Sequence, residues 1–228
     1  MAKCPTKYHA QAGYTLVELL LAVIVGSIVL AGSYASYTVV ARQGDKIAAR
    51  GGVQESGMPT LRRIGRDLRM AGHKELDDNM ESPIGAINNP VNVVDSGNAC
   101  CDQLEIIYDV DTATRQQIIY YVAERQNPTR NALFMDIKNW NGGMWVDSMT
   151  GALVTDYVED FQVETSNPGV KGIPKLVDLS LVLRARFPMA NPDLYQKPDY
   201  EVGNHVIAVN DNYYREEFGA SFYLRNIR

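Results

Sequence analysis

The stretch GYTLVELLLAVIVGSIVLAGSYASYTVVA occupies residues 13–41 and decides the fold of this chain. From Leu19 to Ala41 it contains no charged residue, a run of 23 positions. At about 1.5 Å per residue, a helix over this run is roughly 35 Å long, enough to cross the hydrocarbon core of a bilayer. The run therefore predicts one membrane-spanning helix.

A short basic segment, MAKCPTKYHAQAG at residues 1–13, precedes the run and contains Lys3 and Lys7 but no acidic side chain. Such a segment is typical of a targeting leader whose basic end stays in the cytoplasm. The apolar run is longer than the core of an ordinary secretory signal, and no small-x-small cleavage site ends it. We therefore expect processing before the run, between Gly13 and Tyr14.

One carboxylate, Glu18, lies at the beginning of this apolar segment. A charge at the centre of a bilayer costs about 2.5–3.5 kcal/mol, and the cost falls towards the ends of the span. Glu18 is therefore either a tolerated interfacial residue or a residue kept for a specific contact.

The local sequence Gly13-Tyr14-Thr15-Leu16-Val17-Glu18-Leu19 resembles the class III signal of type IV pilins and pseudopilins. The resemblance implies that a prepilin peptidase cleaves after Gly13 and methylates the new N-terminus at Tyr14, an aromatic residue where the family usually has Phe. It also implies an assembly role for Glu18, against which a neighbouring subunit can place its terminal amine. Because an unpaired carboxylate among packed helices is costly, this pair can set the register between subunits.

The length, hydrophobic content and net charge of the chain restrict the classes of protein to which it can belong. With 228 residues, 46% hydrophobic and 21% charged, the chain is long and apolar enough to build a core of moderate size. The net charge is −5, and removal of the leader leaves 20 basic and 27 acidic side chains, a net charge of −7. The chain has no surplus of basic residues, so we expect no nucleic-acid partner.

After the apolar run, the helical pattern continues to a stop at Gly72, but we expect interruptions at its glycines and a new helical turn at Pro59. Leu61, Ile64 and Leu68 share one helical face. The rest of this segment is rich in arginine, which is typical of a solvated or intersubunit surface that pairs with acids; the arginines are Arg62, Arg63, Arg66 and Arg69.

From residue 75 the pattern changes to strands and loops. A loop is predicted at 75–101, a turn at 139–145, a short helix or loop at 152–157, and a long polar loop at 188–204. Runs rich in β-branched and aromatic residues predict strands at 103–109, 117–123, 131–137, 158–165, 176–187 and 217–226. Short connections favour antiparallel pairing, so we expect an α+β, pilin-like fold in which the long N-terminal helix packs on an antiparallel sheet.

Adjacent Cys100 and Cys101 are the two cysteines that remain without the leader. Two partly buried thiols are the favoured interpretation, and a vicinal disulfide is the alternative, because neighbouring Cα atoms are closer than those of most disulfides. His9, His73 and His205 are isolated, and neither a second Cys pair nor a His cluster accompanies the cysteines, so no metal site and no cofactor is predicted.

Asp109 and Asp111 form a D-x-D pattern of the kind that holds calcium in some pseudopilins. The chain lacks an EF-hand loop, so we expect these aspartates to favour turn geometry instead. It also lacks the G-x-S-x-G, P-loop, H-E-x-x-H and G-x-G-x-x-G motifs, so no catalytic residues and no enzyme activity are predicted.

Three segments, at 61–72, 153–163 and 215–226, look like the PilW-type minor pilins. The resemblance implies a leader at 1–13, an N-terminal helix at 14–72 with its transmembrane part at about 14–41, and a globular head at 73–228. It implies a single-pass inner-membrane protein with a periplasmic head that joins an extracellular pilus through contacts with other pilins and minor pilins. A J-like pseudopilin of type II secretion is the alternative function, and a membrane-anchored enzyme or sensor is a third hypothesis.

Overall fold

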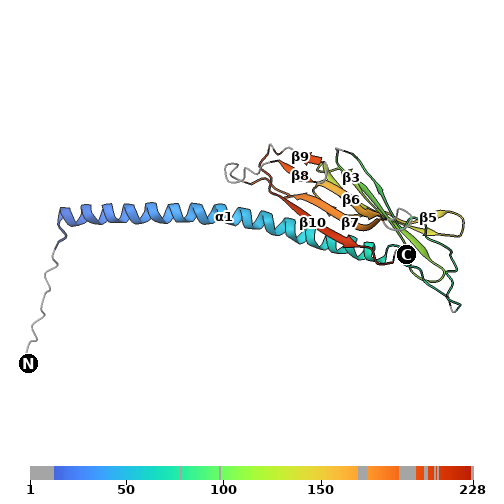
Figure 1. Ribbon diagram of the computed structural model, residues 1–228. Coiled ribbons are helices and arrows are strands. Elements are labelled where there is room, and N and C mark those ends of the chain that lie inside the picture. The colour runs from blue at the N-terminus through green and yellow to red at the C-terminus, as the bar shows by residue number, and fades with distance from the viewer. Residues whose placement is uncertain are drawn as a thin grey trace, which may run out of the picture. The chain divides into compact units, whose positions relative to one another are not determined.

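The structure is a computed structural model that describes residues 13–77, 79–97, 99–168, 174–189, 199–202, 205–207, 209 and 211–226 (Figure 1). The leader before Gly13 and most of the predicted loop at 188–204 lie outside these residues. The chain divides into two compact units, one that ends at Gly44 and one that begins at Asp45.

The helix α1 runs without a break from Leu16 to Met70, through Pro59 and the glycines around it. The predicted interruption is therefore wrong. An interior proline costs about 3 kcal/mol and a glycine up to about 1 kcal/mol relative to alanine. Burial of the helical face from Val53 to Leu68 offsets this cost. The helix ends just before Gly72, which has the left-handed φ of +75° and donates its N–H to Ile107 O at 2.9 Å.

The C-terminal part of α1 packs along β10, Arg215–Tyr223. Gly57 and Gly65 lie against the rings of Phe218 and Phe222, so closely that a Cβ atom at either glycine would overlap the ring. From Gly57 to Gly65 a helix advances about 12 Å, and from Phe218 to Phe222 a strand advances about 13 Å. The two contacts therefore recur at matching intervals along the helix and the strand.

The first sheet is an antiparallel meander in the order β1-β2-β3-β4-β5. Its strands are β1 Val91–Val94, β2 Gln103–Asp109, β3 Arg115–Arg125, β4 Arg130–Trp140 and β5 Trp145–Asp156. One face of β2, β3 and β4 contributes Leu104, Tyr120 and Met135 to the core.

The second sheet has the order β10-β7-β6, with β6 at Val158–Pro168 and β7 at Pro174–Arg184. Tyr157, with a left-handed φ of 60°, separates β5 from β6 and lets the chain leave one sheet for the other. A two-stranded hairpin, β8 Tyr200–Val202 with β9 His205–Ile207, completes the described strands. Val202 of this hairpin packs against Val182 of β7, which is why Val182 is buried although it faces away from Leu181.

A buried polar pair joins α1 to the first sheet. Tyr120 Oη donates to Asp67 Oδ2 at 2.6 Å, and both residues are buried. Burial of the phenol, together with the Asp67 charge, raises the pKa of Tyr120 far above its usual value. The pair fixes the position of the helix on β3 as well as adding to its stability.

The predicted fold class is confirmed, since the long N-terminal helix packs with antiparallel sheets. All six predicted strands overlap observed strands, namely β2, β3, β4, β6, β7 and β10. The buried face of Leu61, Ile64 and Leu68 is also confirmed.

Three further predictions of local structure are wrong. Residues 152–156 form the end of β5 rather than the predicted helix or loop, because β5 pairs with β4 along an exposed edge that shows little hydrophobic alternation. The loop predicted at 75–101 contains β1, a strand too short to give a sequence pattern. The loop predicted at 188–204 contains β8 within its described part.

Candidate functional site

The processing segment lies directly before α1. Gly13 and Tyr14 are both exposed, and the Tyr14 side chain has 86% of its surface accessible. Thr15 caps the helix: its carbonyl accepts the N–H groups of Glu18 and Leu19 at 3.1 and 3.2 Å, and its Oγ1 accepts Glu18 N–H at 3.3 Å. Thr15 and Glu18 thus occupy the N-cap and N3 positions of a capping-box sequence.

Glu18 lies in the first turn of α1 and is exposed. A carboxylate in this turn interacts favourably with the positive end of the helix dipole. Because the carboxylate is exposed, it is accessible to a cation of another chain.

The apolar part of α1 has no protein packed over it within the described residues. Its large side chains are exposed, including Leu20 at 52% and Ile24 at 55%. The helix is long and apolar enough to cross a membrane, with a mean hydropathy of 2.4 over its most apolar window. The hydroxyls of Ser27, Ser33 and Ser36 donate to carbonyls one turn back at 2.7, 2.8 and 3.0 Å, so this surface offers lipid few unsatisfied polar groups.

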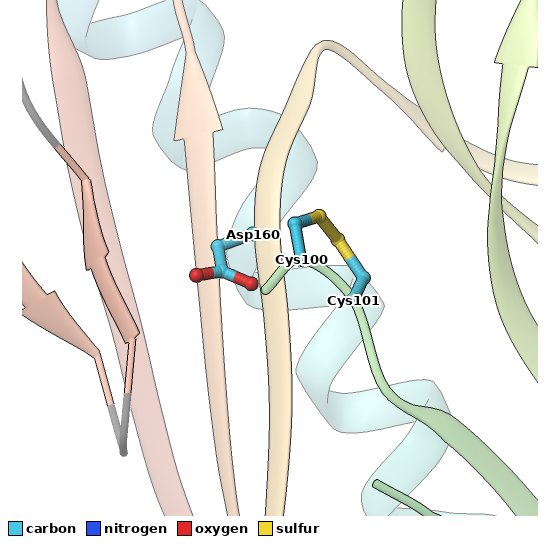
Figure 2. A group of neighbouring side chains, drawn as sticks. All are labelled: Cys100, Cys101 and Asp160. Atoms are coloured by element: carbon cyan, nitrogen blue, oxygen red, sulfur yellow. A yellow bond between two sulfur atoms is a disulfide. The ribbon is translucent and has the colours of Figure 1, made fainter. Parts of the chain in front are cut away.

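A second cluster lies in the head, where Cys100 and Cys101 form a disulfide with each other. This corrects the interpretation of the pair as two free thiols. The sulfur atoms lie within 4.8 Å of a carboxylate oxygen of Asp160 on β6. Figure 2 shows the Asp160 side chain beside the disulfide. Cys100 is exposed, Cys101 is partly buried, and Asp160 is fully buried.

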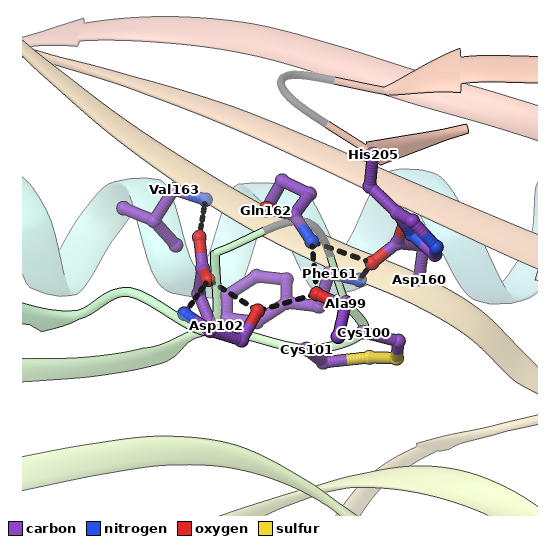
Figure 3. The surroundings of a disulfide bond; sticks show 10 residues. Ala99, Cys100, Cys101, Asp102, Asp160, Phe161, Gln162, Val163 and His205 are labelled. Carbon is purple, nitrogen blue, oxygen red and sulfur yellow. Dashed lines mark hydrogen bonds and ion pairs between the residues drawn. A yellow bond between two sulfur atoms is a disulfide. The ribbon is translucent and has the colours of Figure 1, made fainter. Parts of the chain in front are cut away.

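Asp160 is held from three directions (Figure 3). Its Oδ1 accepts Phe161 N–H at 2.8 Å and the side-chain amide of Gln162 at 2.9 Å. Its Oδ2 contacts Nδ1 of His205 on β9. The sequence gives no sign that Asp160 lies beside the cysteines or that His205 contacts Asp160, because these residues lie far apart along the chain and no local motif connects them.

The loop that carries the cysteines is fixed to β6 through Asp102, on the other side of Phe161 from Asp160 (Figure 3). Asp102 Oδ1 accepts Ser96 N–H at 2.8 Å and Ser96 Oγ–H at 2.9 Å, while Oδ2 accepts Val163 N–H at 2.8 Å. The Asp102 N–H donates to Phe161 O at 2.8 Å. Asp102 therefore ties one end of the disulfide loop to the backbone of β6, and its carboxylate holds the other end through Ser96.

The D-x-D aspartates have different local roles. Asp109 is buried and forms an ion pair with Arg115, with Nε and Oδ1 2.6 Å apart. Asp111 is exposed and its Oδ1 accepts Ala113 N–H at 2.8 Å, a bond that lowers the pKa of Asp111. The Asp111 contact agrees with the expected turn role, whereas Asp109 ends β2 and is the buried partner of Arg115, so the two carboxylates do not share a site.

The arginines of α1 also have separate partners. Arg63 lies 3.3 Å from the sulfur of Met135, Arg66 lies 3.5 Å from Asp67, and Arg69 covers the ring of Phe222. Arg63 and Arg69 thus contact the sheets, the Arg66 contact stays within α1, and all three side chains are exposed.

A cavity of about 630 Å³ lies beside α1 and is lined by Ser56, Asp156 and Arg184 among others. Ser56 Oγ donates to Gly52 O within its own helix at 3.2 Å. Asp156 accepts hydrogen bonds from Arg125 and Arg130, and Arg184 pairs with Glu159 at 3.0 Å. These contacts give the polar lining groups structural partners.

Comparison with known proteins gives one match. Residues 8–34 match the model of the prokaryotic N-terminal methylation motif, a segment that contains Gly13, Tyr14 and Glu18. No curated protein and no solved structure matches the chain. The motif supports a type IV pilin-like protein, of the pilin or pseudopilin kind, that is anchored in a membrane and processed by a prepilin peptidase.

Proposed function

We propose that the chain is a minor pilin of a type IV pilus, a non-enzymatic filament subunit that acts in pilus priming, assembly or at the tip. The observation that carries the proposal is the methylation motif at residues 8–34, placed at the start of an exposed apolar helix. Proteins with this motif are structural filament subunits.

In this proposal, cleavage between Gly13 and Tyr14 removes the leader and leaves a methylated amine one residue before the N-cap. A positive charge at a helix N-terminus opposes the helix dipole, and Glu18 in the first turn offsets that effect. Before assembly, the subunit is anchored in the inner membrane with its head in the periplasm. In the filament, the amine of one subunit pairs with Glu18 of a neighbour, so that neither charge is buried alone.

The Glu18 contact can be tested without changing the shape of the helix. Glu18→Gln keeps the side-chain volume and removes the charge, so membrane insertion and processing should persist while incorporation into filaments falls sharply. Glu55→Gln, at an exposed position farther along the same helix, is the matched control and should be incorporated normally. Normal incorporation of Glu18→Gln shows that the carboxylate is dispensable.

The minor role is supported by the size and irregularity of the head. A subunit repeated along a whole filament needs a compact, self-complementary surface, because the same patch meets itself at every step. Here, long connections precede β1 and β2, and one of them carries the disulfide. Such a head is better suited to a low-copy position with distinct neighbours.

The test is quantitative proteomics of sheared filaments together with a deletion strain. The proposal predicts that this chain is scarce in filaments and that its deletion reduces piliation. If the chain is the most abundant subunit, the minor role is wrong. If the deletion strain keeps its pili but no longer exports folded proteins, the chain is a type II secretion pseudopilin.

A further inference from the structure

The head contains three side chains that can ligate one cation, gathered from two parts of the chain. Cys100 and Cys101 come from the loop before β2, and Asp160 comes from β6. Their ligand atoms lie within 4.8 Å of one another. A tetrahedral zinc ion with bonds of about 2.3 Å to sulfur and 2.0 Å to oxygen needs ligand separations of about 3.5–3.8 Å. The Asp160 oxygen therefore needs to approach the sulfurs by on the order of 1 Å, and the two sulfurs, which are bonded to each other in the disulfide, must separate to about 3.8 Å once that bond is broken.

Asp160 has the surroundings of a metal-binding carboxylate. It is fully buried, and its hydrogen bonds from Phe161 N–H and Gln162 hold the plane of the carboxylate in place. His205 contacts its second oxygen, so this carboxylate has a further polar neighbour, as carboxylates that ligate metals usually have. Each carboxylate oxygen has two lone pairs, so Oδ2 keeps one for a further ligand.

The cysteine loop is positioned before any ion arrives. Asp102 and Gln162 both fasten it to β6: Asp102 through Val163 N–H at 2.8 Å, and Gln162 through Ala99 O at 3.3 Å. Cys100 is exposed, so an ion can enter from solvent and keep one position for water. The ligand residues are thus partly held in place by the protein, and the site is open to solvent at Cys100.

We propose that Cys100, Cys101 and Asp160 form a redox-gated binding site for a thiophilic divalent cation of the zinc class. A dithiol or phosphine reductant gives two electrons to the disulfide, the S–S bond breaks, and two protons bind the sulfurs. A zinc ion then displaces both protons and binds two thiolates and the Asp160 carboxylate. Thiolate ligands select zinc and cadmium over calcium or magnesium. This proposal does not depend on the filament role.

The experiment uses the full chain in detergent micelles, with Zn²⁺ alone as the ligand and a chelating dye as competitor. Protein reduced by a phosphine, which is then removed without air, should bind one Zn²⁺, whereas oxidised protein should bind none. Asp160→Asn should weaken binding by about 10–100-fold. Glu164→Gln, at an exposed position on the same strand, should bind like the parent chain. Cys100→Ser with Cys101→Ser should keep the fold, since adjacent cysteines close no loop, and should lose binding.

X-ray absorption at the zinc edge of the unmodified chain decides the ligand set even if a variant fails to fold. The expected first shell has two sulfur atoms at about 2.3 Å and oxygen at about 2.0 Å. Binding of equal strength by oxidised and reduced protein overturns the proposal, as does unchanged affinity of Asp160→Asn. A shell without sulfur overturns it as well.

Discussion

The same helix contains two apolar regions that differ in what surrounds them. Between Leu16 and Val40 the apolar side chains cover the whole circumference and are exposed, whereas between Val53 and Leu68 they form one face, which is buried. An all-round apolar surface needs an apolar solvent, while a single apolar face needs only a sheet to pack against. The distribution of apolar residues around the helix, rather than their number, therefore separates a membrane segment from a packing segment.

The sharpest test of this comparison changes the same residue type in both regions. Ile64 is fully buried, whereas Ile24 has 55% of its surface exposed. Ile64→Ala should reduce the free energy of unfolding of the head by about 2–5 kcal/mol, because it removes buried methyl groups and leaves a cavity. Ile24→Ala should leave that free energy unchanged. Near-UV circular dichroism of the protein in micelles, followed during chemical unfolding, measures the free energy for both variants. Equal effects of the two changes would contradict the division of the helix into a membrane segment and a packing segment.

A smaller effect is expected from the buried polar contact of the packing region. Tyr120→Phe leaves the Asp67 carboxylate without its 2.6 Å donor and should cost about 1.5–3 kcal/mol. Tyr121→Phe is the matched control, because Tyr121 lies on the opposite face, is half-buried, and donates to Asp136 at 3.2 Å. We expect it to cost less than about 1 kcal/mol. A larger loss for Tyr121→Phe in chemical unfolding would mean that the sheet face towards α1 has been assigned wrongly.

The same tyrosine gives the head an alkaline pH dependence. The folded state raises the pKa of Tyr120, so above the unfolded pKa of about 10 the unfolded chain binds fewer protons than the folded one. The stability from this group is fully present below that pH and falls by about 1.4 kcal/mol per pH unit above it. Above pH 10, the free energy of unfolding should therefore fall less steeply with pH for Tyr120→Phe than for the parent chain, as measured by chemical unfolding at each pH.

The glycines of α1 give a contrast in the sign of the effect. A Cβ atom at Gly65 overlaps the Phe222 ring, so Gly65→Ala should destabilise the head by about 1–3 kcal/mol. A Cβ atom at Gly51 has nothing within 4 Å, so Gly51→Ala should stabilise the helix by up to about 1 kcal/mol. Thermal unfolding should shift in opposite directions for the two variants, and a shift in the same direction would contradict the close approach of helix and β10.

The sequence predicts the features that depend on neighbouring residues. The membrane-capable run, the strand at 103–109 and the helical face of Leu61, Ile64 and Leu68 all follow from local composition or periodicity. The uninterrupted course of α1 through Pro59 does not, because burial against the sheet overrides local propensity. Long-range neighbours such as Asp160 and Cys101 meet only through strand pairing and loop anchoring, which leave no local signal.

The N-terminus of the assembled protein is the most direct test of the central claim, that the chain is a processed, membrane-anchored filament subunit. Mass spectrometry of the protein from membranes and sheared filaments should find Tyr14 as the first residue, carrying a methyl group on its amine. Gly13→Arg should leave the precursor uncut in the same assay. A leader still attached to the assembled protein, or an N-terminus beyond Ala41, would contradict the claim.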